Sequence, residues 1–415
     1  DYALIQGPPG TGKTARVLRT LVELLLRSPE EVLLIVAYTN RAVDEIGRTL
    51  RAAGIDFLRL GTREATELPE TLIGTTAQRL TAAELQRAVA RCRVVLGTIA
   101  SVLMTPELFA LKTFTTLLVD EASQLLESHL VGVLAAVRRA ILIGDERQLP
   151  AVVVQGADHS AVQDERLRQR GWRNWSDSLF ERLLRQCRQY GWAHAYALLQ
   201  RQGRMHPILQ HFPSTVFYGG HLQPAGLEHQ QSERLPFRAS PQSPLEELVS
   251  RHRLLFVACV PDAEAYGYHP EEAALVSALV CALARLWGEE FSERHLGVIT
   301  LYRRQAVLIR QQLPAPLRGV VTVDTVERFQ GSERESIVVS FALNHCWELR
   351  YAQSLATMPD GVVVDRKLNV ILTRARQQLV LVGCPAILEQ IPLYRRLLEF
   401  VKHHGCWVAP GFVRQ

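Results

Sequence analysis

Residues 7–14 read Gly-Pro-Pro-Gly-Thr-Gly-Lys-Thr and directly follow the apolar run Tyr2-Ala3-Leu4-Ile5. The stretch fits the pattern G-x-x-x-x-G-K-[ST], in which glycines let successive backbone N–H groups curl around an anion. Apolar residues at 17, 18, 21, 24 and 25 then recur at helical spacing, which places the loop at a helix N-terminus. A strand, this loop and a helix in that order predict a site for a nucleoside triphosphate.

We expect this loop to cradle the phosphates of ATP, with Lys13 reaching the β- and γ-phosphates and the Thr14 hydroxyl binding Mg²⁺. The loop residues assigned to the nucleotide are Gly7, Pro8, Pro9, Gly10, Thr11, Gly12, Lys13 and Thr14.

Hydrolysis needs a second acidic site, and the apolar run Leu117-Leu118-Val119 ends in Asp120 and Glu121. Adjacent residues at a strand end face different ways. We therefore expect Asp120 to hold Mg²⁺ and Glu121 to orient and deprotonate the attacking water. An isolated Asp-Glu pair is more typical of a solvated turn, but a pair after a buried strand and downstream of a phosphate loop favours catalysis.

Length and composition limit the class of protein. The chain has 415 residues, of which 47% are hydrophobic, so two or three domains are expected. The sequence shows neither an apolar run of about 20 residues nor a secretory signal, and no membrane partner is expected. Seven scattered cysteines without a C-x-x-C pair argue against zinc, iron–sulfur and disulfide frameworks. They favour the cytoplasm, or association with the nucleoid in a bacterium.

The chain begins at Asp1 without methionine, so we expect it to be an excised or trimmed fragment. Its net charge is +5, and only four of its 47 basic residues are lysine. Codon bias explains most of this arginine excess, although guanidinium groups also suit phosphates and bases. The charge therefore supports a polyanionic partner only weakly.

Short continuous apolar runs alternate with helical patterns along the chain. The expected strands are 32–37, 94–97, 117–119 and 141–143, then 255–260, 298–300, 320–323, 337–341 and 379–382. The expected helices between them include 41–53, 271–287, 303–312 and 366–377. Continuous apolar strands separated by helices predict parallel sheets that are covered on both faces. Residues 221–253 are rich in proline and polar residues and predict a surface loop.

Polar residues at further strand ends argue against a small-molecule kinase with one such domain. In the run 142–150, Leu-Ile-Gly-Asp-Glu-Arg-Gln-Leu-Pro, Gln148 lies where a γ-phosphate sensor is expected. Arg204 and Arg374 lie in the second half of the chain. Arginines that approach a γ-phosphate from a second domain stabilise the charge that builds up in phosphoryl transfer.

Ten segments in order resemble the superfamily 1 helicases of the 5′-to-3′ branch. They are most similar to the helicase part of the replication helicase–nuclease and to the RNA helicase of nonsense-mediated decay. The segments are G-P-P-G-T-G-K-T (7–14), A-Y-T-N-R-A-V-D (37–44), G-T-I-A-S (97–101), V-D-E-A-S-Q (119–124), I-G-D-E-R-Q-L-P (143–150), S-L-F-E-R-L (178–183), R-M-H-P (204–207), F-Y-G-G-H-L (217–222), T-V-E-R-F-Q-G-S-E (325–333) and L-N-V-I-L-T-R-A-R (368–376).

The resemblance implies two tandem RecA-like domains, at 1–195 and 196–415, each a mostly parallel doubly wound α/β sheet, with ATP in the cleft between them. It makes Gln148 the sensor, Arg204 and Arg374 the fingers, and Gly331 and Glu333 nucleotide contacts.

The resemblance also implies that the nucleic-acid backbone contacts Thr39, Asn40, Thr98, Ser101 and Thr325. Thr and Asn just past strand ends suit phosphate oxygens. Helix capping explains Thr39 and Asn40 about equally well.

Several features depart from the family pattern. The glutamine segment that reads adenine and the accessory β-barrel belong upstream of the phosphate loop, where this chain has not begun. No nuclease pattern is found, so nuclease activity, if the natural protein has it, must lie elsewhere; a nuclease or accessory domain N-terminal to this fragment is one possibility. The family string Q-Y-R-M-H-P is here Gln202-Gly203-Arg204-Met205-His206-Pro207, without its aromatic residue.

Basic residues alternate with Trp172 and Trp175 between 166 and 175, as in some single-strand binders. A surface loop held by two half-buried tryptophans is the favoured interpretation.

Taken together, the sequence predicts an ATP-dependent helicase or translocase that acts on single-stranded or forked nucleic acid. DNA is favoured over RNA, with 5′-to-3′ polarity and a role in DNA replication and repair. The alternative is an ATP-switched clamp that binds nucleic acid and remodels or recruits partners without unwinding.

Overall fold

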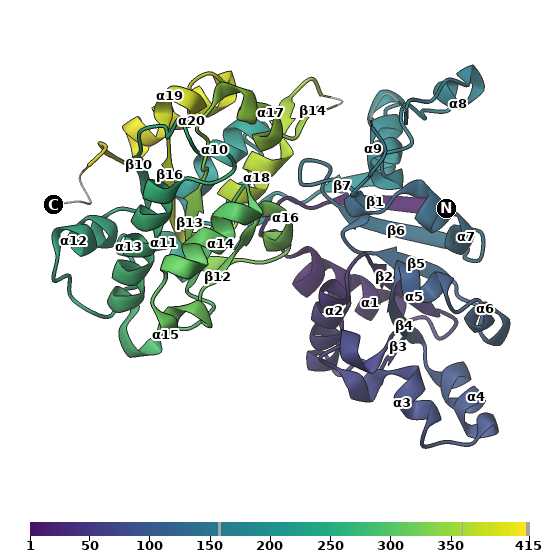
Figure 1. Cartoon of the computed structure of the whole chain (residues 1–415). Coiled ribbons are helices and arrows are strands. Elements are labelled where there is room, and N and C mark those ends of the chain that lie inside the picture. The colour runs from purple at the N-terminus through teal and green to yellow at the C-terminus, as the bar shows by residue number, and fades with distance from the viewer. Residues whose placement is uncertain (157–158, 359, 412–415) are drawn as a thin grey trace. The chain divides into compact units, whose positions relative to one another are not determined.

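The computed structural model describes residues 1–156, 159–358 and 360–411, and the chain forms two compact units, residues 1–200 and 201–415 (Figure 1). The first unit consists of β1 (Tyr2–Gln6), a wide helical turn (Lys13–Leu18), α1 (Arg19–Leu25), β2 (Leu33–Ala37), α2 (Asn40–Ala52), β3 (Leu58–Arg59), α3 (Ile73–Ala77), α4 (Ala82–Arg91), β4 (Val94–Thr98), α5 (Ile99–Leu103), α6 (Glu107–Leu111), β5 (Thr116–Val119), α7 (Glu127–Leu134), β6 (Arg139–Gly144), α8 (Glu165–Gln169), α9 (Leu179–Gln189) and β7 (Tyr196–Leu198).

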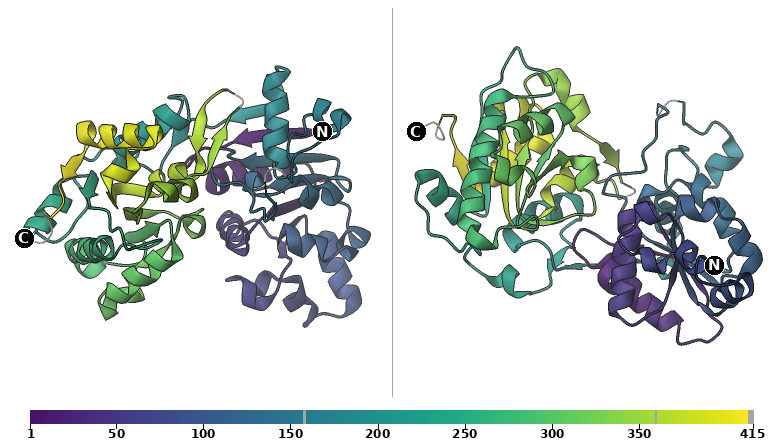
Figure 2. Two further views of the ribbon diagram at one scale, coloured as in Figure 1. Left: turned by 45° about the horizontal axis from the view of Figure 1, so that its top comes forward. Right: turned by 60° about the horizontal axis from the view of Figure 1, so that its bottom comes forward.

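The seven strands of the first unit form one parallel sheet in the order β3-β4-β2-β5-β6-β1-β7. Crossovers between parallel strands are right-handed, so the direction of movement across the sheet decides which face a helix covers. The chain moves one way through α1 and α2 and returns through α5, α7 and α9. The first two helices therefore lie on one face and the later helices on the other, as the right-hand view of Figure 2 shows.

Alternate residues of each strand pack into two separate hydrophobic cores, one on each face of the sheet, because successive side chains of a strand point to opposite faces. Leu33 and Ile35 of β2 pack with α1 and α2 residues such as Val22. Leu34 and Val36 of the same strand pack into the core that receives α5, α7 and α9. All five residues of β2 are buried, which explains why this strand reads as a continuous apolar run.

The second unit consists of β8 (Arg201–Gln202), α10 (Pro207–Phe217), β9 (Gln223–Pro224), α11 (Glu228–Gln231), α12 (Pro244–Arg251), β10 (Leu254–Ala258), α13 (Pro270–Trp287), β11 (Leu296–Thr300), α14 (Arg303–Gln312), α15 (Ala315–Arg318), β12 (Thr322–Thr325), α16 (Val326–Phe329), β13 (Arg334–Ser340), α17 (Leu349–Ala352), β14 (Leu355–Thr357), β15 (Val363–Asp365), α18 (Arg366–Leu372), β16 (Ala375–Gly383), α19 (Pro385–Leu388), α20 (Pro392–His404) and β17 (Cys406–Val408).

Its main sheet is also parallel, in the order β12-β11-β13-β16-β10-β17. The chain moves toward the β12 edge through α13 and α14 and returns through α18 and α20, so the two pairs of helices cover opposite faces. The neighbouring strands β11 and β13 therefore send their connections in opposite directions. The predicted α/β class with parallel, doubly wound sheets is confirmed.

Two predicted segments were wrong. Residues 366–377 are not one helix, because α18 ends at Leu372 and Ala375 already pairs with Arg334 of β13. Residues 221–253 are not only a loop, since β9, α11 and α12 lie within them. The start of α12 is fixed by Ser243, whose hydroxyl accepts a hydrogen bond from the Glu246 N–H at 3.2 Å. A Ser-Pro-x-Glu string was a helix-start signal that the composition obscured.

The strand β7 pairs with β1 and so belongs to the first unit, whereas the sequence interpretation placed the boundary between residues 195 and 196. Within the described residues, none of the helices combines the length and the apolar character that crossing a membrane requires.

Candidate nucleotide site

The loop after β1 has the backbone that its glycines predict. Gly10 and Gly12 both have φ of 76°, in the left-handed region that glycine adopts without strain. Gly12 immediately precedes the helical turn, and its carbonyl accepts from the N–H groups of Arg16 and Val17 at 3.0 Å. The loop thus ends at a helix N-terminus, where free N–H groups and the helix dipole favour an anion.

Lys13 folds back across this loop. Its ammonium donates to the Gly7 carbonyl at 2.8 Å and lies 3.9 Å from a carboxylate oxygen of Glu121. A Cβ at position 7 would lie 2.3 Å from Lys13 Cγ, so the loop depends on glycine there. The positive charge is paired only loosely, which leaves it available to an incoming phosphate.

Thr14 and Asp120 come together beneath the loop. The Thr14 hydroxyl donates to the Asp120 carboxylate at 2.7 Å, although the two residues are 106 positions apart in sequence. Asp120 is buried at the end of β5, and this burial, followed by the charge of Glu121, raises its pKa to about 6. A hydroxyl and a carboxylate at this separation are the oxygen ligands that Mg²⁺ prefers, so these two residues fit the ion.

Glu121 adopts an unusual backbone conformation. Its φ of 50° lies in the left-handed region, which costs an ordinary side chain about 1 kcal/mol or more. The Glu121 N–H is held by the Asp120 carboxylate at 3.0 Å, and Gln124 donates to the Glu121 carboxylate at 3.4 Å. The two adjacent acids are consequently separated: Asp120 is turned inward, whereas the Glu121 side chain is partly exposed.

The loop after β6 lies beside that of β1, because these two strands are neighbours in the sheet. Gln148 is buried there and donates to the Asp145 carboxylate at 2.7 Å. Gly7 N–H donates to the Gly144 carbonyl at 2.9 Å, which ties the phosphate loop to the β6 end. The structure thus brings the predicted sensor loop to the same sheet edge as Lys13.

One buried network at this edge was missed from the sequence. The Gln6 side-chain amide donates to the Glu146 carboxylate at 2.8 Å, and Arg188 of α9 donates to the Gln6 side-chain oxygen Oε1 at 2.7 Å. Burial, together with the charge of Asp145, raises the pKa of Glu146 to about 7. The network joins β1, the sensor loop and α9. Its members lie up to 182 positions apart, and no spacing signal connects them.

The second unit gathers its own predicted residues at one edge. The Arg204 guanidinium pairs with the Glu333 carboxylate and also donates to the Thr373 carbonyl at 3.1 Å. Arg374 is fully buried and donates to the Val370 carbonyl at 3.0 Å. Desolvation alone raises the pKa of Glu333, but the charge of Arg204 and those of nearby arginines outweigh it and hold that pKa below its ordinary value.

Gly331 and Gly203 flank this cluster. Gly331 has φ of 79° with open space around its Cα, so its backbone is free to approach a ligand. A Cβ at Gly203 would lie 3.0 Å from the flexible end of Leu227. The neighbouring Gln202 is buried and accepts from the Arg204 N–H at 2.8 Å, which shapes the turn that carries Arg204.

The residues suggested for the nucleic-acid backbone are found mainly as helix caps. The Thr39 hydroxyl accepts from the Ala42 N–H at 3.2 Å, and the Thr98 hydroxyl accepts from the Ser101 N–H at 3.1 Å. The Asn40 side-chain oxygen accepts from Arg59 at 3.3 Å. Thr325 is the last residue of β12 and is half-buried.

Other candidate features have local explanations. Trp172 is half-buried under the Arg182 guanidinium, 3.9 Å from its ring centroid, and Trp175 is exposed. His269 lies near Glu272 and Cys384, a set with metal-ligand chemistry. Both His269 nitrogens are engaged, however, one 2.9 Å from the Val260 carbonyl and the other 3.2 Å from the Glu272 N–H. We assign His269 to capping α13.

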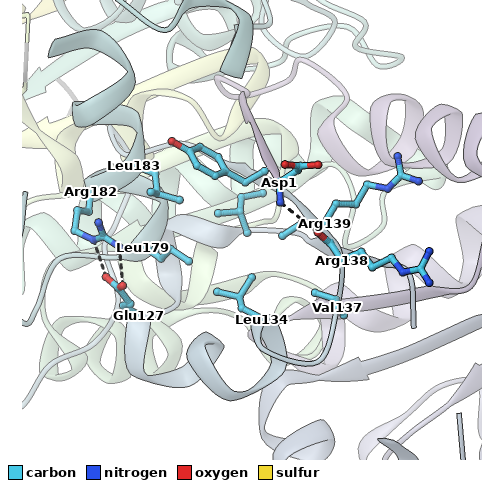
Figure 3. A pocket seen from close by; sticks show the side chains of 12 residues that line it. Asp1, Glu127, Leu134, Val137, Arg138, Arg139, Leu179, Arg182 and Leu183 are labelled. Atoms are coloured by element: carbon cyan, nitrogen blue, oxygen red, sulfur yellow. Dashed lines mark hydrogen bonds and ion pairs between the residues drawn. The ribbon is translucent and has the colours of Figure 1, made fainter. Parts of the chain in front are cut away.

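A hollow of about 280 Å³ lies at the amino end of the strands of the first sheet, opposite the end that carries the phosphate loop (Figure 3). Its lining comes from the amino ends of β1 and β6 and from α7 and α9. Glu127 and Arg182 form a two-bonded ion pair on its wall, at 2.6 and 2.8 Å. Because the phosphate loop follows the carboxyl end of β1, this hollow is separate from the nucleotide residues.

Comparison with known proteins agrees with this geometry. Family models described as "AAA domain" match residues 175–386 and, in two overlapping segments, residues 1–88 and 64–155. The chain belongs to this AAA-domain family. Its curated relatives are named as ATP-dependent helicases, which agrees with the resemblance to superfamily 1 helicases seen in its motifs.

Two curated relatives are similar over nearly the whole chain. A DNA replication ATP-dependent helicase/nuclease of Arabidopsis thaliana is 28% identical over 416 residues, which cover 98% of this chain and 29% of the relative. An ATP-dependent helicase of Saccharomyces cerevisiae is 29% identical over 448 residues, which cover 98% of this chain and 42% of the relative. The chain thus spans less than half the length of either relative.

Among solved structures, an arterivirus nonstructural protein 10 helicase in complex with DNA aligns with 92% of this chain and 60% of its own. Its identity is 14% and its TM-score 0.45, a likeness too low to inform the residues of this chain.

Proposed function

We propose that this chain couples ATP hydrolysis to movement along single-stranded nucleic acid and to separation of a duplex. The observation that carries the proposal is the Thr14–Asp120 hydrogen bond of 2.7 Å beneath the phosphate loop, with Lys13 and Glu121 beside it. This arrangement combines an anion-binding helix end, a pair of oxygen ligands and a separate carboxylate base.

In the proposed reaction, the loop from Gly7 to Thr14 binds the phosphates and Lys13 exchanges the Gly7 carbonyl for phosphate oxygens. Thr14 and Asp120 would hold Mg²⁺, which would supply positive charge to the bound triphosphate. The Glu121 carboxylate takes a proton from water as the water oxygen attacks the γ-phosphorus, and ADP leaves. Gln148 senses the γ-phosphate from the neighbouring loop.

The second unit contributes Arg204 and Arg374, whose charges stabilise the phosphoryl group during transfer. Gly331 and Glu333 are proposed to contact the nucleotide as well. Arg204 is paired with Glu333 in this structure, so engagement of the triphosphate requires that pair to open or rearrange. Both arginines are also held by backbone carbonyls of the second unit.

The proposed substrate is single-stranded or forked DNA, followed in the 5′-to-3′ direction and gripped at Thr39, Asn40, Thr98, Ser101 and Thr325. The Arabidopsis relative, named as a DNA replication helicase/nuclease, supports DNA rather than RNA. Separating each base pair costs about 1.4 kcal/mol of stacking, so the hydrolysis cycle must be coupled to the grip on the strand.

A forked-duplex assay tests this proposal. Duplexes with a single 5′ tail, a single 3′ tail or both tails are incubated with the chain, Mg²⁺ and ATP, and ATP hydrolysis is measured in parallel with DNA, RNA or no strand. We expect strand release from substrates with a 5′ tail and DNA-stimulated hydrolysis. Stimulated hydrolysis without strand release identifies the clamp, and hydrolysis indifferent to either strand contradicts a nucleic-acid motor.

A further inference from the structure

The carboxyl edge of the second sheet carries a group of rings that the nucleotide residues do not use. We define this aromatic platform as Tyr266, Tyr302, His345 and Trp347. The Tyr266 and Trp347 ring centroids are 4.7 Å apart, and the His345 and Trp347 rings are stacked at 5.6 Å with 14° between their planes. Tyr302 meets Tyr266 edge-on at 6.3 Å. These side chains come from three segments of the chain that the fold brings together.

Two members of the platform remain largely exposed. Tyr266 is 43% and Trp347 47% exposed, whereas Tyr302, which contacts Tyr266 edge-on, is half-buried. Rings this large cover more apolar surface than any other side chain when buried. The exposed rings therefore form an apolar surface that is not buried in the folded chain and that can contact a ligand.

The loops beneath the rings are fixed by one buried carboxylate. Glu348 accepts from the Gly267 N–H at 3.1 Å and, with its other oxygen, from the N–H groups of Asn344 and His345 at 2.8 and 2.9 Å. The Asn344 side chain donates to the Tyr268 carbonyl at 2.9 Å. The loop after β10 is thus bound to the loop after β13, and the rings are ordered before any ligand arrives, which reduces the entropy cost of binding.

The position of the platform follows from the topology. Tyr302 comes two residues after β11 and His345 five residues after β13, and these neighbouring strands send their connections in opposite directions. In open α/β sheets, ligands bind outside the carboxyl ends of strands where the connections diverge in this way. Thr325, proposed above for the strand backbone, ends β12 on the other side of β11.

The charge around the platform is mixed. Arg303, Arg304 and Arg350 are exposed near it, and Arg304 donates to the Tyr266 carbonyl at 3.2 Å. Asp262 and Glu264 lie on the same loop as Tyr266 and offset part of this positive charge. The electrostatic attraction for a ligand that binds mainly through phosphates is therefore weak here. A ligand with flat aromatic rings can stack on the exposed ring faces.

We propose that an unpaired base of the nucleic-acid strand stacks on the Trp347 ring of the platform, and that the Tyr266 ring contacts the edge of the same base. This inference rests on the proposed function and adds base contacts to a site that was otherwise described through the backbone. Stacking on an aromatic face tolerates any base. The platform therefore holds a single strand without reading its sequence, and it rejects a duplex, whose bases are already stacked.

The test measures binding of the full chain to two fluorescent 15-nucleotide DNA probes, oligothymidylate and the same backbone with abasic sites. The variants are Trp347→Ala, Tyr266→Ala and the conservative Trp347→Phe. Trp175→Ala is the matched control, since Trp175 is 54% exposed in the first unit. Alanine substitution of stacking residues costs about 1–3 kcal/mol per base, or about 5- to 150-fold in Kd.

We expect Trp347→Ala to weaken oligothymidylate binding at least about fivefold and to leave abasic binding unchanged, with Trp347→Phe restoring most of the loss. The slope of affinity against salt should stay the same, because no phosphate contact is removed. Trp175→Ala should resemble the unaltered chain with both probes.

Three results would overturn the platform. In the first, Trp347→Ala and Tyr266→Ala bind both probes as the unaltered chain does. In the second, both probes weaken equally. In the third, the substitutions change the oligomeric state in sedimentation, which shows that a second copy covers the rings. If DNA-stimulated hydrolysis persists in these cases, the proposed function stands without the platform. If the unaltered chain neither binds strand nor responds to it, both fail.

Discussion

Replacing Asp120 by Asn should make the first unit more stable at neutral pH while abolishing hydrolysis. Asp120 is completely buried, and its pKa in the folded chain is about 6 against an ordinary value of 3.8. A carboxyl whose pKa is raised by folding stabilises the fold fully below its unfolded pKa, and that contribution is lost as the pH rises through the folded pKa. Above pH 7 this difference between the folded and unfolded pKa values lowers the free energy of unfolding by about 3 kcal/mol.

An asparagine at this position avoids the ionisation penalty but loses one acceptor. Asp120 accepts hydrogen bonds from both the Thr14 hydroxyl and the Glu121 N–H. An amide has one acceptor oxygen and keeps only one of these hydrogen bonds, so the loss of the other costs about 1 kcal/mol. The net gain at pH 8 is therefore about 2 kcal/mol, or about 4–8 °C in Tm for a unit of this size. At pH 5 the ionisation penalty falls to about half, and most of the gain should disappear.

Thermal melting of the nucleotide-free chain at pH 5 and pH 8, without Mg²⁺, checks this prediction. Asp56→Asn serves as the control, because Asp56 is exposed and its replacement should leave Tm nearly unchanged at both values. A lower Tm for Asp120→Asn at pH 8, or an equal change at both pH values, would refute the reasoning that burial raises the cost of this carboxylate.

The remaining predictions concern catalysis and nucleotide choice. Lys13→Ala should lose both ATP binding and turnover, whereas Glu121→Gln should still bind ATP in a filter assay yet hydrolyse almost none. Near-normal turnover by Glu121→Gln would show that another group is the base. Arg204→Ala and Arg374→Ala should keep single-strand affinity and lose about 10³–10⁵-fold in kcat, so a fully active variant of either would exclude it as a finger. Because position 203 offers no aromatic face, the ratio of kcat/KM for ATP and GTP should be close to one and should rise in Gly203→Tyr, for which Leu227 has to shift. A strong ATP preference that the tyrosine leaves unaltered would contradict this.

The parts of the fold and site that could be predicted are those encoded in contiguous sequence. The strand, loop and helix of residues 2–25 form one local unit, and Asp120 with Glu121 directly ends a buried strand. Each depends on spacing within a few residues, which a single sequence displays. Parallel pairing could also be predicted, because strands buried on both faces have no alternation of polar and apolar residues.

The rest depends on contacts between distant segments. The sequence at 366–377 reads as one helix, yet Ala375 pairs with β13, a strand that begins 41 residues earlier in the chain, at Arg334. The Gln6–Glu146–Arg188 network and the Glu348 contacts that hold the aromatic platform have no spacing signal at all. Each of their members is an unremarkable polar residue until the topology places it beside the others.

The left-handed conformation of Glu121 has a practical consequence for engineering this protein. A glycine at position 121 would relieve that backbone strain, just as an asparagine at 120 would remove a buried charge. A library selected for heat resistance alone would therefore enrich substitutions at these two neighbouring positions and yield robust proteins that no longer hydrolyse ATP. Any such selection needs a simultaneous requirement for turnover.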